Sequence, residues 1–574
     1  MINTVKRQSE FFELPIMRRR VVLLMLLSLF FILFSRAVYL QGMQKDFLQK
    51  EGGNRSNRIE TLHAYRGRIL DRNNYVFAVS TPVETISANP PDIIITKEQK
   101  TQLAKLLDVN QIDLEKKLQK KETRFVYLKK QMAPEKASQI MALKIPGIRS
   151  EKEYKRAYPL KEVAAHIIGF SGDDGNGQEG IELFSNKSLA GESGYKKILQ
   201  DRAGRIVDDL QDVKVPRDGQ DIILSIDARL QDKAYRILEK TVEAHSALSG
   251  SAILLDAKSG EILAMTNYPS YNPNARRNNT EFLRNRAATD IFEPGSTIKP
   301  ITVSAALENQ SITPNTIIDT SAGFYKVGRS LIRDTHNNGK ISVKEVIQKS
   351  SNIGAIIIGE NVQPKYLWET LNNFGFGEKT GVDFPGEASG KLINYKNWEK
   401  TSQASASYGY GMSSSLLQLA QSYTVFANQG EIKPVSLLKK EEPTIGKKII
   451  SKKTTDEMLD MLESVVNDGT ATQAKVNGYR VAGKTGTARK NNNGQYEAKY
   501  IASFVGLAPV SNPKFVLAIM IDEPAEGGYY GGVVAGPAFS SIMAEALKIY
   551  SIPQDGYSLE FVPIKLKNEP DRSL

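Results

Sequence analysis

The chain of 574 residues contains no cysteine. This absence excludes disulfides and thiolate metal sites, and it suits an oxidising compartment, where a free thiol is a liability. Residues 173–177 resemble a calcium loop only faintly, because they lack the regular ligand spacing and the distal glutamate. We interpret them as an ordinary turn, and we expect neither a metal nor a cofactor.

Histidine is also scarce, with only His63, His166, His245 and His336 in the chain. A Ser-His-Asp hydrolase needs one well-placed histidine. His336 lies in a polar run, residues 334–339, that is typical of an exposed loop. No serine stands in a G-x-S-x-G nucleophile elbow. A serine enzyme built from this sequence is therefore expected to use a lysine as its base.

Charge of one sign is not concentrated in any region. The 64 acidic residues are interspersed with 76 basic ones, and the net charge of +12 corresponds to a pI of about 9.3. No nucleic-acid-binding motif accompanies this charge, so we exclude nucleic acid as a partner. The basic excess indicates a solvated surface with some attraction to anionic lipid.

One long apolar run lies near the N-terminus. Residues 21–35 carry no charge and follow an arginine cluster at 18–20. With Arg36 snorkelling at the far edge, residues 21–41 suffice to span a membrane, which needs about 20 residues. A cleaved signal peptide is the alternative, but no small-x-small site follows the run. The arginines predict a cytoplasmic tail over residues 1–20 and an exported, periplasmic body.

A chain of this length needs two or more domains. Residues 42–220 predict an elongated, mixed, non-catalytic domain. Within it, residues 69–79 indicate strand, turn and strand, and leucines recur at helical spacing over residues 97–131. No cluster of catalytic residue types is found in this region.

Residues 221–550 predict a second domain of the α/β (α+β) class, followed by a tail over 551–574. Strand patterns at both ends enclose a largely helical middle, roughly residues 296–430. This order implies one central antiparallel sheet flanked by helices. Strands are expected at 221–226, 251–256, 262–265, 479–482, 502–506 and 515–520, and a helix at 230–247.

Three polar motifs stand in a fixed order within this second domain. They are Ser296-Thr297-Ile298-Lys299, Ser350-Ser351-Asn352 and Lys484-Thr485-Gly486. Ser-x-x-Lys alone is a weak signal, because it occurs four times, whereas Lys-Thr-Gly occurs once. The ordered trio is the signature of the serine enzymes that penicillin acylates.

The chemistry of acyl transfer explains these residue types. A serine hydroxyl needs a neighbour that removes its proton, and on a helix Lys299 shares a face with Ser296. Residues 292–295 suit a turn that feeds a helix start, where backbone N–H groups can stabilise an oxyanion. Lys299 acts as a base only if its pKa is lowered, and we expect burial and the nearby charge of Lys484 to lower it.

The chain resembles the class B penicillin-binding proteins, and specifically their division-specific FtsI type. The similarity covers nearly the whole chain after the apolar run. It includes residues 66–72, 177–182 and 201–205, which resemble the family's pedestal motifs, and residues 269–274 ahead of the catalytic motifs. The resemblance implies a serine β-lactamase-like transpeptidase domain, which cross-links stem peptides of septal peptidoglycan as a D-Ala-D-Ala transpeptidase.

The resemblance also implies roles for the motif residues. Ser296 would form the acyl-enzyme with the penultimate D-alanine of a stem pentapeptide donor, and Lys299 would take the serine proton. Ser350 and Asn352 would relay protons and hold the substrate amide. Backbone N–H groups of Ser296 and Thr487 would form the oxyanion hole.

The third motif would bind the substrate's terminal carboxylate through Lys484, Thr485 and Thr487, with Gly486 between them in the substrate-binding strand. An amine of an acceptor strand would then take the acyl group, and β-lactam antibiotics would inhibit the enzyme. Further partners implied are a membrane glycan polymerase, other division proteins and the inner membrane. Tyrosine- and glycine-rich segments at residues 408–411 and 529–532 resemble loops that border the cleft.

Five alternatives remain open at this point. Elongation-type relatives commonly have Asp where this chain has Asn352, and often Pro-Pro-Gly where it has residues 293–295. A bifunctional class A enzyme would need glycosyltransferase motifs near the N-terminus. A non-enzymatic scaffold would not need intact motifs, and a penicillin sensor would need a larger intracellular region. A class A β-lactamase needs a water-activating glutamate, and Glu369 is one residue out of place for that role.

Overall fold

The computed structural model describes most of the chain. The described residues are 15–200, 206–275, 281–328, 330–492 and 495–556. The motif at residues 201–205 lies outside them, as do the first 14 residues and residues 557–574 of the two expected tails.

The chain forms two compact units, each assembled from separate stretches of sequence. Unit 1 comprises residues 1–64, 82–153 and 192–217. Unit 2 comprises residues 65–81, 154–191 and 218–574. All three polar motifs therefore belong to unit 2.

The apolar run near the N-terminus is helical. Helix α1 (Ile16–Val38) continues as a π-helical turn, η1 (Tyr39–Met43). Together they form 28 residues whose most apolar window has a mean hydropathy of 2.5 and buries none of its residues. The helix begins before residue 21, where the predicted membrane span starts, and it includes the arginines at 18–20. Its length and exposure suit a single membrane-spanning anchor.

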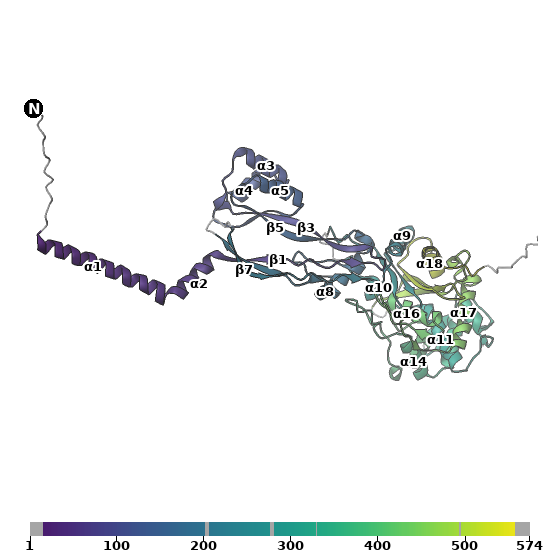
Figure 1. Ribbon diagram of the computed structural model, residues 1–574. Helices are drawn as coiled ribbons and strands as arrows, with labels where there is room; N and C mark the ends of the chain where they lie inside the picture. The colour runs from purple at the N-terminus through teal and green to yellow at the C-terminus, as the bar shows by residue number, and fades with distance from the viewer. Residues whose placement is uncertain (1–14, 201–205, 276–280, 329, 493–494, 557–574) are drawn as a thin grey trace, which may run out of the picture. The chain divides into compact units, whose positions relative to one another are not determined.

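Unit 1 combines two strand groups with a small helical cluster (Figure 1). One group is an antiparallel sheet of β1 (Asn57–Leu62), β6 (Gly194–Gln200) and β7 (Ile206–Lys214). In the other, the second half of β3 (Val76–Ala88) pairs with β4 (Val126–Met132). The cluster consists of α3 (Lys97–Leu107), α4 (Gln111–Leu118) and α5 (Pro134–Ala142), whereas α2 (Lys45–Ser56) lies between η1 and β1.

The helical spacing over residues 97–131 predicts too much helix. Helix α4 ends at Leu118, and residues 126–132 form strand β4 instead. Phe125, Val126 and Tyr127 favour a strand, because aromatic and β-branched side chains pack well on a pleated surface. The leucines of α3, α4 and β4 still share one hydrophobic core.

In unit 2, the strand–turn–strand pattern predicted for residues 69–79 is confirmed. Strand β2 (Ile69–Leu70) pairs with the first half of β3 and, in parallel, with β8 (Ile222–Ile223). The strand predicted at 221–226 shortens to β8, because the next amides bind carbonyl groups of two different segments. Strand β5 (Ile148–Ala157) also pairs with β3.

Two arginines enclose a buried glutamate beside these strands. Nε of Arg66 donates to Oε2 of Glu182 at 2.7 Å, and Nε of Arg156 donates to Oε1 at 2.7 Å. Removing either arginine would leave a buried charge uncompensated, which destabilises strongly. The motifs at 66–72 and 177–182 therefore contribute to structure here. Short helices accompany them: η3 (Lys161–Val163), α6 (Ala165–Ile168), α7 (Gly180–Phe184) and α8 (Asn186–Ala190).

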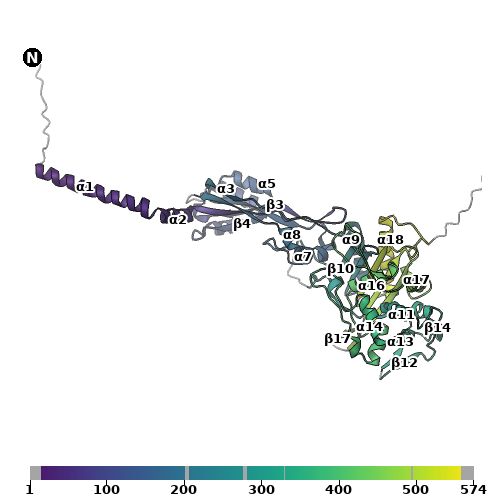
Figure 2. The same ribbon diagram turned by 60° about the horizontal axis from the view of Figure 1, so that its bottom comes forward.

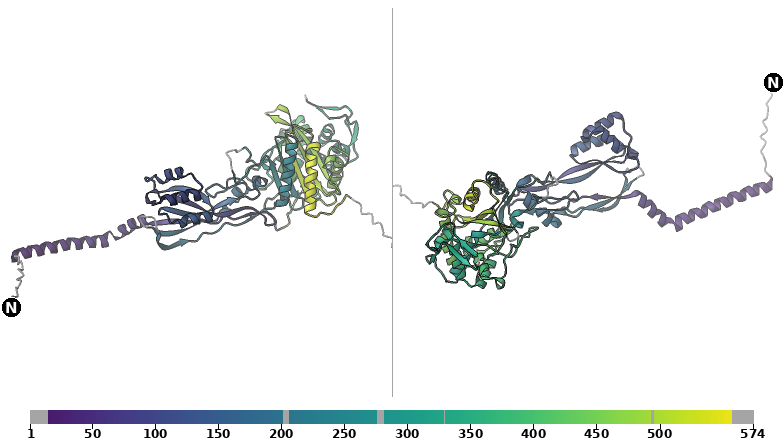
Figure 3. Two further views of the ribbon diagram at one scale, coloured as in Figure 1. Left: turned by 90° about the horizontal axis from the view of Figure 1, so that it is seen from above. Right: turned by 180° about the vertical axis from the view of Figure 1, so that it is seen from behind.

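The central antiparallel sheet predicted for the second domain is confirmed. Its order is β10 (Ile262–Tyr268), β9 (Ser249–Asp256), β19 (Phe515–Asp522), β18 (Gln495–Ala508) and β17 (Ala482–Asn492). Helices α9 (Ala228–Ala244) and α18 (Gly531–Ile549) pack side by side over the sheet (Figure 3, teal and yellow). Helix α16 (Leu416–Ala427) also packs against the sheet, on β9, β18 and β19.

Helices fill the middle of unit 2, as the sequence predicts (Figure 2). They are α10 (Arg286–Thr289), η4 (Gly295–Ile298), α11 (Lys299–Glu308), α12 (Val343–Gln348), α13 (Asn352–Glu360), α14 (Pro364–Asn373), η5 (Tyr395–Asn397), α15 (Lys400–Ser407), α17 (Lys452–Asn467) and η6 (Thr472–Ala474). Three small two-stranded ribbons lie among them. They are β11 (Ile317–Asp319) with β14 (Lys340–Ser342), β12 (Phe324–Val327) with β13 (Ser330–Arg333), and β15 (Glu431–Ile432) with β16 (Lys447–Lys448).

Candidate active site

The serine turn, residues 292–298, is the first element of the site. It ends in the single 3-10 turn η4, which runs directly into α11. Gly295 has a φ of +56°, a conformation that favours glycine. Its amide donates to the carbonyl of Gly409 at 3.0 Å. Ser296 therefore stands where the turn becomes helical, in agreement with the predicted turn and helix start.

Lys299 is fully buried, and its Nζ donates to three oxygens of the second motif. The distances are 2.6 Å to the carbonyl oxygen of Ser350, 3.3 Å to its Oγ and 2.7 Å to Oδ1 of Asn352. Burial lowers the pKa of Lys299 to about 7, although the charge of Asp334 opposes the shift. Among the described residues no hydrogen bond joins Nζ to Ser296 Oγ, so proton transfer from Ser296 to Lys299 stays a prediction.

The second motif stands at the start of α13. Ser351 caps this helix, and its Oγ accepts a hydrogen bond from the amide of Gly354 at 2.9 Å. Ser350, just before the cap, has a φ of +59°. Such a conformation is unusual for a residue with a side chain and is found mostly where a structure enforces it. It directs both the carbonyl and the hydroxyl of Ser350 towards Lys299.

Asp334 holds this motif in place, although it was not among the site residues predicted from the sequence. Its Oδ1 accepts from the amides of Asn352 at 2.6 Å and Ile353 at 3.1 Å, and its Oδ2 accepts from Ser351 Oγ at 2.5 Å. A carboxylate is favoured at a helix N-terminus. The only available signal was its place in the polar run 334–339, which predicts a loop and no more.

The third motif lies within strand β17 at the edge of the central sheet. The sequence predicts a strand at residues 479–482 followed by the motif, but β17 begins only at Ala482 and contains it. The amides of Tyr479 and Arg480 bind Val476 and Asp555 instead, so they do not join the sheet.

Lys484 reaches from β17 to the second motif. It is fully buried, and its Nζ donates to Ser350 Oγ at 2.9 Å and to Thr485 Oγ1 at 3.3 Å. Burial lowers its pKa well below the usual range, and the charge of Lys299 adds to the shift. Burial is the leading cause of the lowered pKa of Lys299, as predicted, and the share predicted for the charge of Lys484 stays a prediction. Because the two lysines interact, they titrate as a pair.

The remaining residues of β17 fit closely against their neighbours. Oγ1 of Thr485 lies 2.9 Å from Oγ1 of Thr470. A Cβ on Gly486 would lie 2.3 Å from a side-chain oxygen of β18 and 3.1 Å from the carbonyl of the serine turn, so only glycine fits. Oγ1 of Thr487 accepts from the amide of Gly531 at 3.0 Å.

The three motifs therefore meet around one hydroxyl, Ser350 Oγ, which receives hydrogen bonds from both lysines. Asn352 is linked to this hydroxyl through Lys299, whose Nζ donates to Oδ1 of Asn352. The turn that carries Ser296 packs on β17, next to the third motif. A serine nucleophile, a lysine of pKa about 7 and a second cation within one site can perform acyl transfer.

Two residues considered in the sequence analysis stand apart from the site. His336 is exposed in a loop, as predicted. Glu369 lies on the solvated face of α14, where its Oε1 is 3.7 Å from Nζ of Lys365, which also agrees with the prediction.

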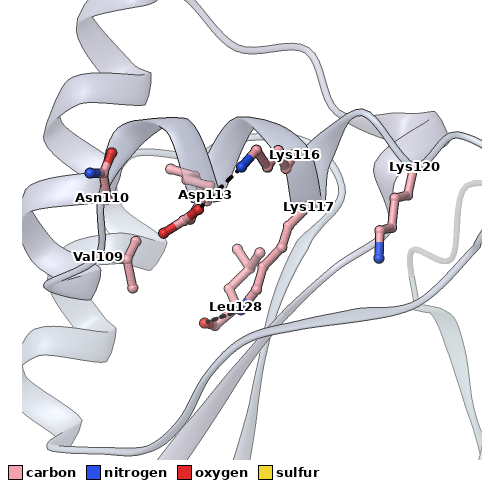
Figure 4. A pocket seen from close by; sticks show the side chains of 8 residues that line it. Val109, Asn110, Asp113, Lys116, Lys117, Lys120 and Leu128 are labelled. Atoms are coloured by element: carbon pink, nitrogen blue, oxygen red, sulfur yellow. Dashed lines mark hydrogen bonds and ion pairs between the residues drawn. The ribbon is translucent and has the colours of Figure 1, made fainter.

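A pocket of about 490 Å³ lies in unit 1, between α4 and β4 (Figure 4). Its lining contains Leu114, Leu128 and three lysines. Nζ of one of these, Lys117, donates to the backbone carbonyls of Tyr127 and Leu128. The lysine thereby covers carbonyl groups of β4, and none of the three polar motifs lines the pocket.

Comparisons with known proteins agree with this geometry. Residues 250–544 match the penicillin-binding protein transpeptidase domain, and residues 61–224 match the penicillin-binding protein dimerisation domain. The chain is 42% identical over 538 residues to the probable peptidoglycan D,D-transpeptidase PenA of Neisseria meningitidis, with 92% of each chain covered. It is 38% identical over 539 residues to the peptidoglycan D,D-transpeptidase FtsI of Escherichia coli, covering 92% of this chain and 91% of FtsI.

Solved structures show the same relationship. Penicillin-binding protein 3 of Mycobacterium tuberculosis, complexed with aztreonam, is 26% identical with a TM-score of 0.68, covering 86% of this chain and 98% of that one. The transpeptidase domain of Burkholderia pseudomallei penicillin-binding protein 3 is 43% identical with a TM-score of 0.54. The match covers 58% of this chain and 97% of that one. Fold and site together define a serine D,D-transpeptidase of the penicillin-binding type. Within that class, the chain belongs to the class B penicillin-binding proteins of the FtsI type.

Proposed function

We propose that this transpeptidase cross-links stem peptides of septal peptidoglycan during cell division, through an acyl-enzyme on Ser296. The observation that carries the proposal is the pair of buried lysines that share Ser350 Oγ beside the serine turn. This arrangement supports a proton path that leads from the nucleophile to the leaving group without histidine.

The first half-reaction begins with proton transfer to Lys299. With a pKa of about 7, part of the Lys299 population is neutral at physiological pH and able to accept a proton from Ser296. The oxygen of Ser296 then attacks the carbonyl carbon of the penultimate D-alanine. Ser350, bonded to both lysines, returns a proton to the departing amine, and the terminal D-alanine leaves.

Lys484, Thr485 and Thr487 bind the terminal carboxylate of the donor peptide, with Gly486 between them in the substrate-binding strand. A bound carboxylate favours the charged form of Lys484, and a charged Lys484 disfavours a second charge on Lys299. Donor binding thus prepares the base. Asn352 holds the substrate amide, and the backbone N–H groups of Ser296 and Thr487 stabilise the oxyanion.

The second half-reaction transfers the acyl group from Ser296 to an amine of an acceptor strand. β-Lactams compete for the same serine, because their strained amide mimics the donor peptide bond. The complex of the Mycobacterium tuberculosis relative with aztreonam supports this extension.

We further propose the arrangement of the chain in the cell. Residues 1–20 lie in the cytoplasm, residues 21–41 anchor the protein in the inner membrane, and the body faces the periplasm. Residues 42–220 form the pedestal domain, residues 221–550 form the transpeptidase domain and residues 551–574 form a tail. We also propose that the protein works beside a membrane glycan polymerase and other division proteins, and the likeness to FtsI supports this proposal.

The experiment that tests this function supplies lipid-linked pentapeptide precursor and its polymerase to the full-length protein. Dimeric muropeptides are expected, and they should disappear with penicillin or with Ser296→Ala. A fluorescent penicillin should label the wild type and not the variant. Stoichiometric labelling of folded Ser296→Ala would refute the nucleophile, and absence of dimers with active polymerase would favour a non-enzymatic scaffold.

A further inference from the structure

Glu293 lies in the serine turn, three residues before the nucleophile, and belongs to none of the three motifs. Its Oε1 accepts a hydrogen bond from the amide of Gly411 at 2.9 Å and another from the hydroxyl of Tyr496 at 3.3 Å. Gly411 belongs to the tyrosine loop, residues 408–411. Tyr496 lies near the tip of the hairpin formed by β17 and β18. One carboxyl oxygen therefore joins three segments that are far apart in sequence.

Close packing accompanies these two hydrogen bonds. A Cβ on Gly409 would lie 2.1 Å from the carbonyl oxygen of Gly295, whose own amide donates to Gly409 at 3.0 Å. The ring centroids of Tyr410 and Tyr496 are 5.8 Å apart. Because the tyrosine loop touches the serine turn so closely, a displaced loop would also displace Ser296.

The second carboxyl oxygen of Glu293 costs folding free energy, so the arrangement is not explained by stability alone. Oε2 of Glu293 is buried and has no hydrogen-bond partner in the described part of the chain. Burial raises the pKa of this carboxyl, although the bonds from Gly411 and Tyr496 oppose the shift. Buried polar atoms without partners carry a desolvation penalty. Local exceptions of this kind are expected where function depends on geometry.

We propose that Glu293 is a positioning residue for acyl transfer, which fastens the tyrosine loop and the β17–β18 hairpin tip to the turn that presents Ser296. The inference rests on the proposed function. Through Tyr496 it links the hairpin that carries the third motif to the nucleophile by a route separate from Ser350. Misplacement of reacting groups by about 1 Å can slow a reaction about 100-fold.

The test measures the second-order acylation rate constant of the full-length protein in detergent with a fluorescent penicillin. We expect Glu293→Ala to lower it at least about tenfold. Glu293→Gln keeps an oxygen that accepts both hydrogen bonds, so it should remain within about threefold of wild type. Glu369→Ala and Tyr366→Phe, both on α14, are the matched controls and should acylate normally.

A double-mutant cycle supplies the readout that a general loss of stability would not give. Tyr496→Phe should slow acylation. Adding it to Glu293→Ala should have no further effect, because Glu293→Ala has already removed the hydrogen bond from the Tyr496 hydroxyl. Tyr496 is about half exposed near the hairpin tip, so this variant should fold normally. Additive effects, a wild-type rate for Glu293→Ala, or a Gln variant as slow as Ala would overturn the inference. Labelling of Ser296→Ala would instead refute the proposed function.

Discussion

At the scale of single residues, two buried ammonium groups compete for one hydroxyl. Nζ of Lys299 and Nζ of Lys484 lie 3.3 Å and 2.9 Å from Ser350 Oγ. Burial and like charge both disfavour protonation of the second lysine. The pair therefore holds fewer than two protons near neutral pH, which leaves one amine free to act as a base.

Replacing Lys484 tests the need for the second cation. Lys484→Ala should slow acylation about 100-fold, because removal of one preorganised charge from a catalytic site amounts to about 3 kcal/mol. Rapid-mixing kinetics with fluorescent penicillin measure the effect, and the exposed Lys365→Ala on α14 serves as the control. A rate constant equal to that of wild type would exclude a role for Lys484 in acylation.

The pKa of Lys299 gives acylation an expected pH dependence. The pKa of this lysine is lowered to about 7, and only its neutral form accepts the serine proton. The rate constant should therefore be high above about pH 7 and should fall as the pH drops below it, approaching a tenfold loss per pH unit. Stopped-flow measurements from about pH 5 to about pH 9 would show this limb. A flat profile between about pH 6 and about pH 8 would contradict Lys299 as the base.

Part of the site was predictable at this scale, and part was not. Ser296, Lys299, Ser350, Asn352 and Lys484 belong to motifs whose residue types follow from the chemistry. Asp334 and Glu293 act through the backbone amides that they meet in space. Their roles depend on which backbone amides the fold brings next to them, and no local spacing in the sequence predicts that.

At the scale of elements, the second motif depends on a loop carboxylate. Asp334 receives three hydrogen bonds from the first residues of α13 and from its cap. These bonds hold Ser350 in its positive-φ conformation next to Lys299. The start of α13 thus fixes the position of Ser350, which lies on the proposed proton path.

Replacing Asp334 should displace Ser350 and the start of α13. Asp334→Ala should slow acylation at least about tenfold and lower stability by about 1–2 kcal/mol, as loss of a helix cap does. Acylation kinetics and thermal unfolding measure the two effects. Ser342→Ala removes the cap of α12, so it is the control for stability alone. Equal acylation rates in the two variants would show that Asp334 is only a cap.

The success of element prediction followed the strength of the local pattern. The apolar runs of β9, β10 and β19 and the amphipathic α9 were predicted, because their periodicities are regular. Strand β4 was missed, because its charged residues continue the helical spacing of the preceding segment. The start of β17 was misplaced, since amide partners outside the sheet cannot be read from the sequence.

At the scale of the whole molecule, the three motifs alone do not distinguish a transpeptidase from a β-lactamase. The structure supplies the difference at Glu369, which is exposed on α14 and pairs with Lys365. Among the described residues, neither a hydrogen bond nor an ion pair joins Glu369 to the three motifs. The family relationship over the full chain agrees with a transpeptidase.

The acyl-enzyme formed with penicillin should accordingly persist. With Glu369 on the solvated face of α14, we expect the ester on Ser296 to last for many minutes. With a peptide thioester donor, we expect an amine acceptor to be preferred over water. Mass spectrometry of the intact protein after dilution measures the lifetime. Rapid catalytic hydrolysis of penicillin by the purified protein would favour the β-lactamase alternative.

The pairing of β9 with β19 also dictates when unit 2 can fold. Ser249 lies opposite Asp522 in the finished sheet, so the first strand emerges long before its neighbour exists. Synthesis adds about 5–20 residues per second, which leaves an apolar strand waiting on the order of tens of seconds. Long-range pairings of this kind also slow folding. Until the C-terminal strands arrive, the nascent chain would therefore present the apolar hairpin of β9 and β10 as an incomplete sheet, which is exposed to aggregation.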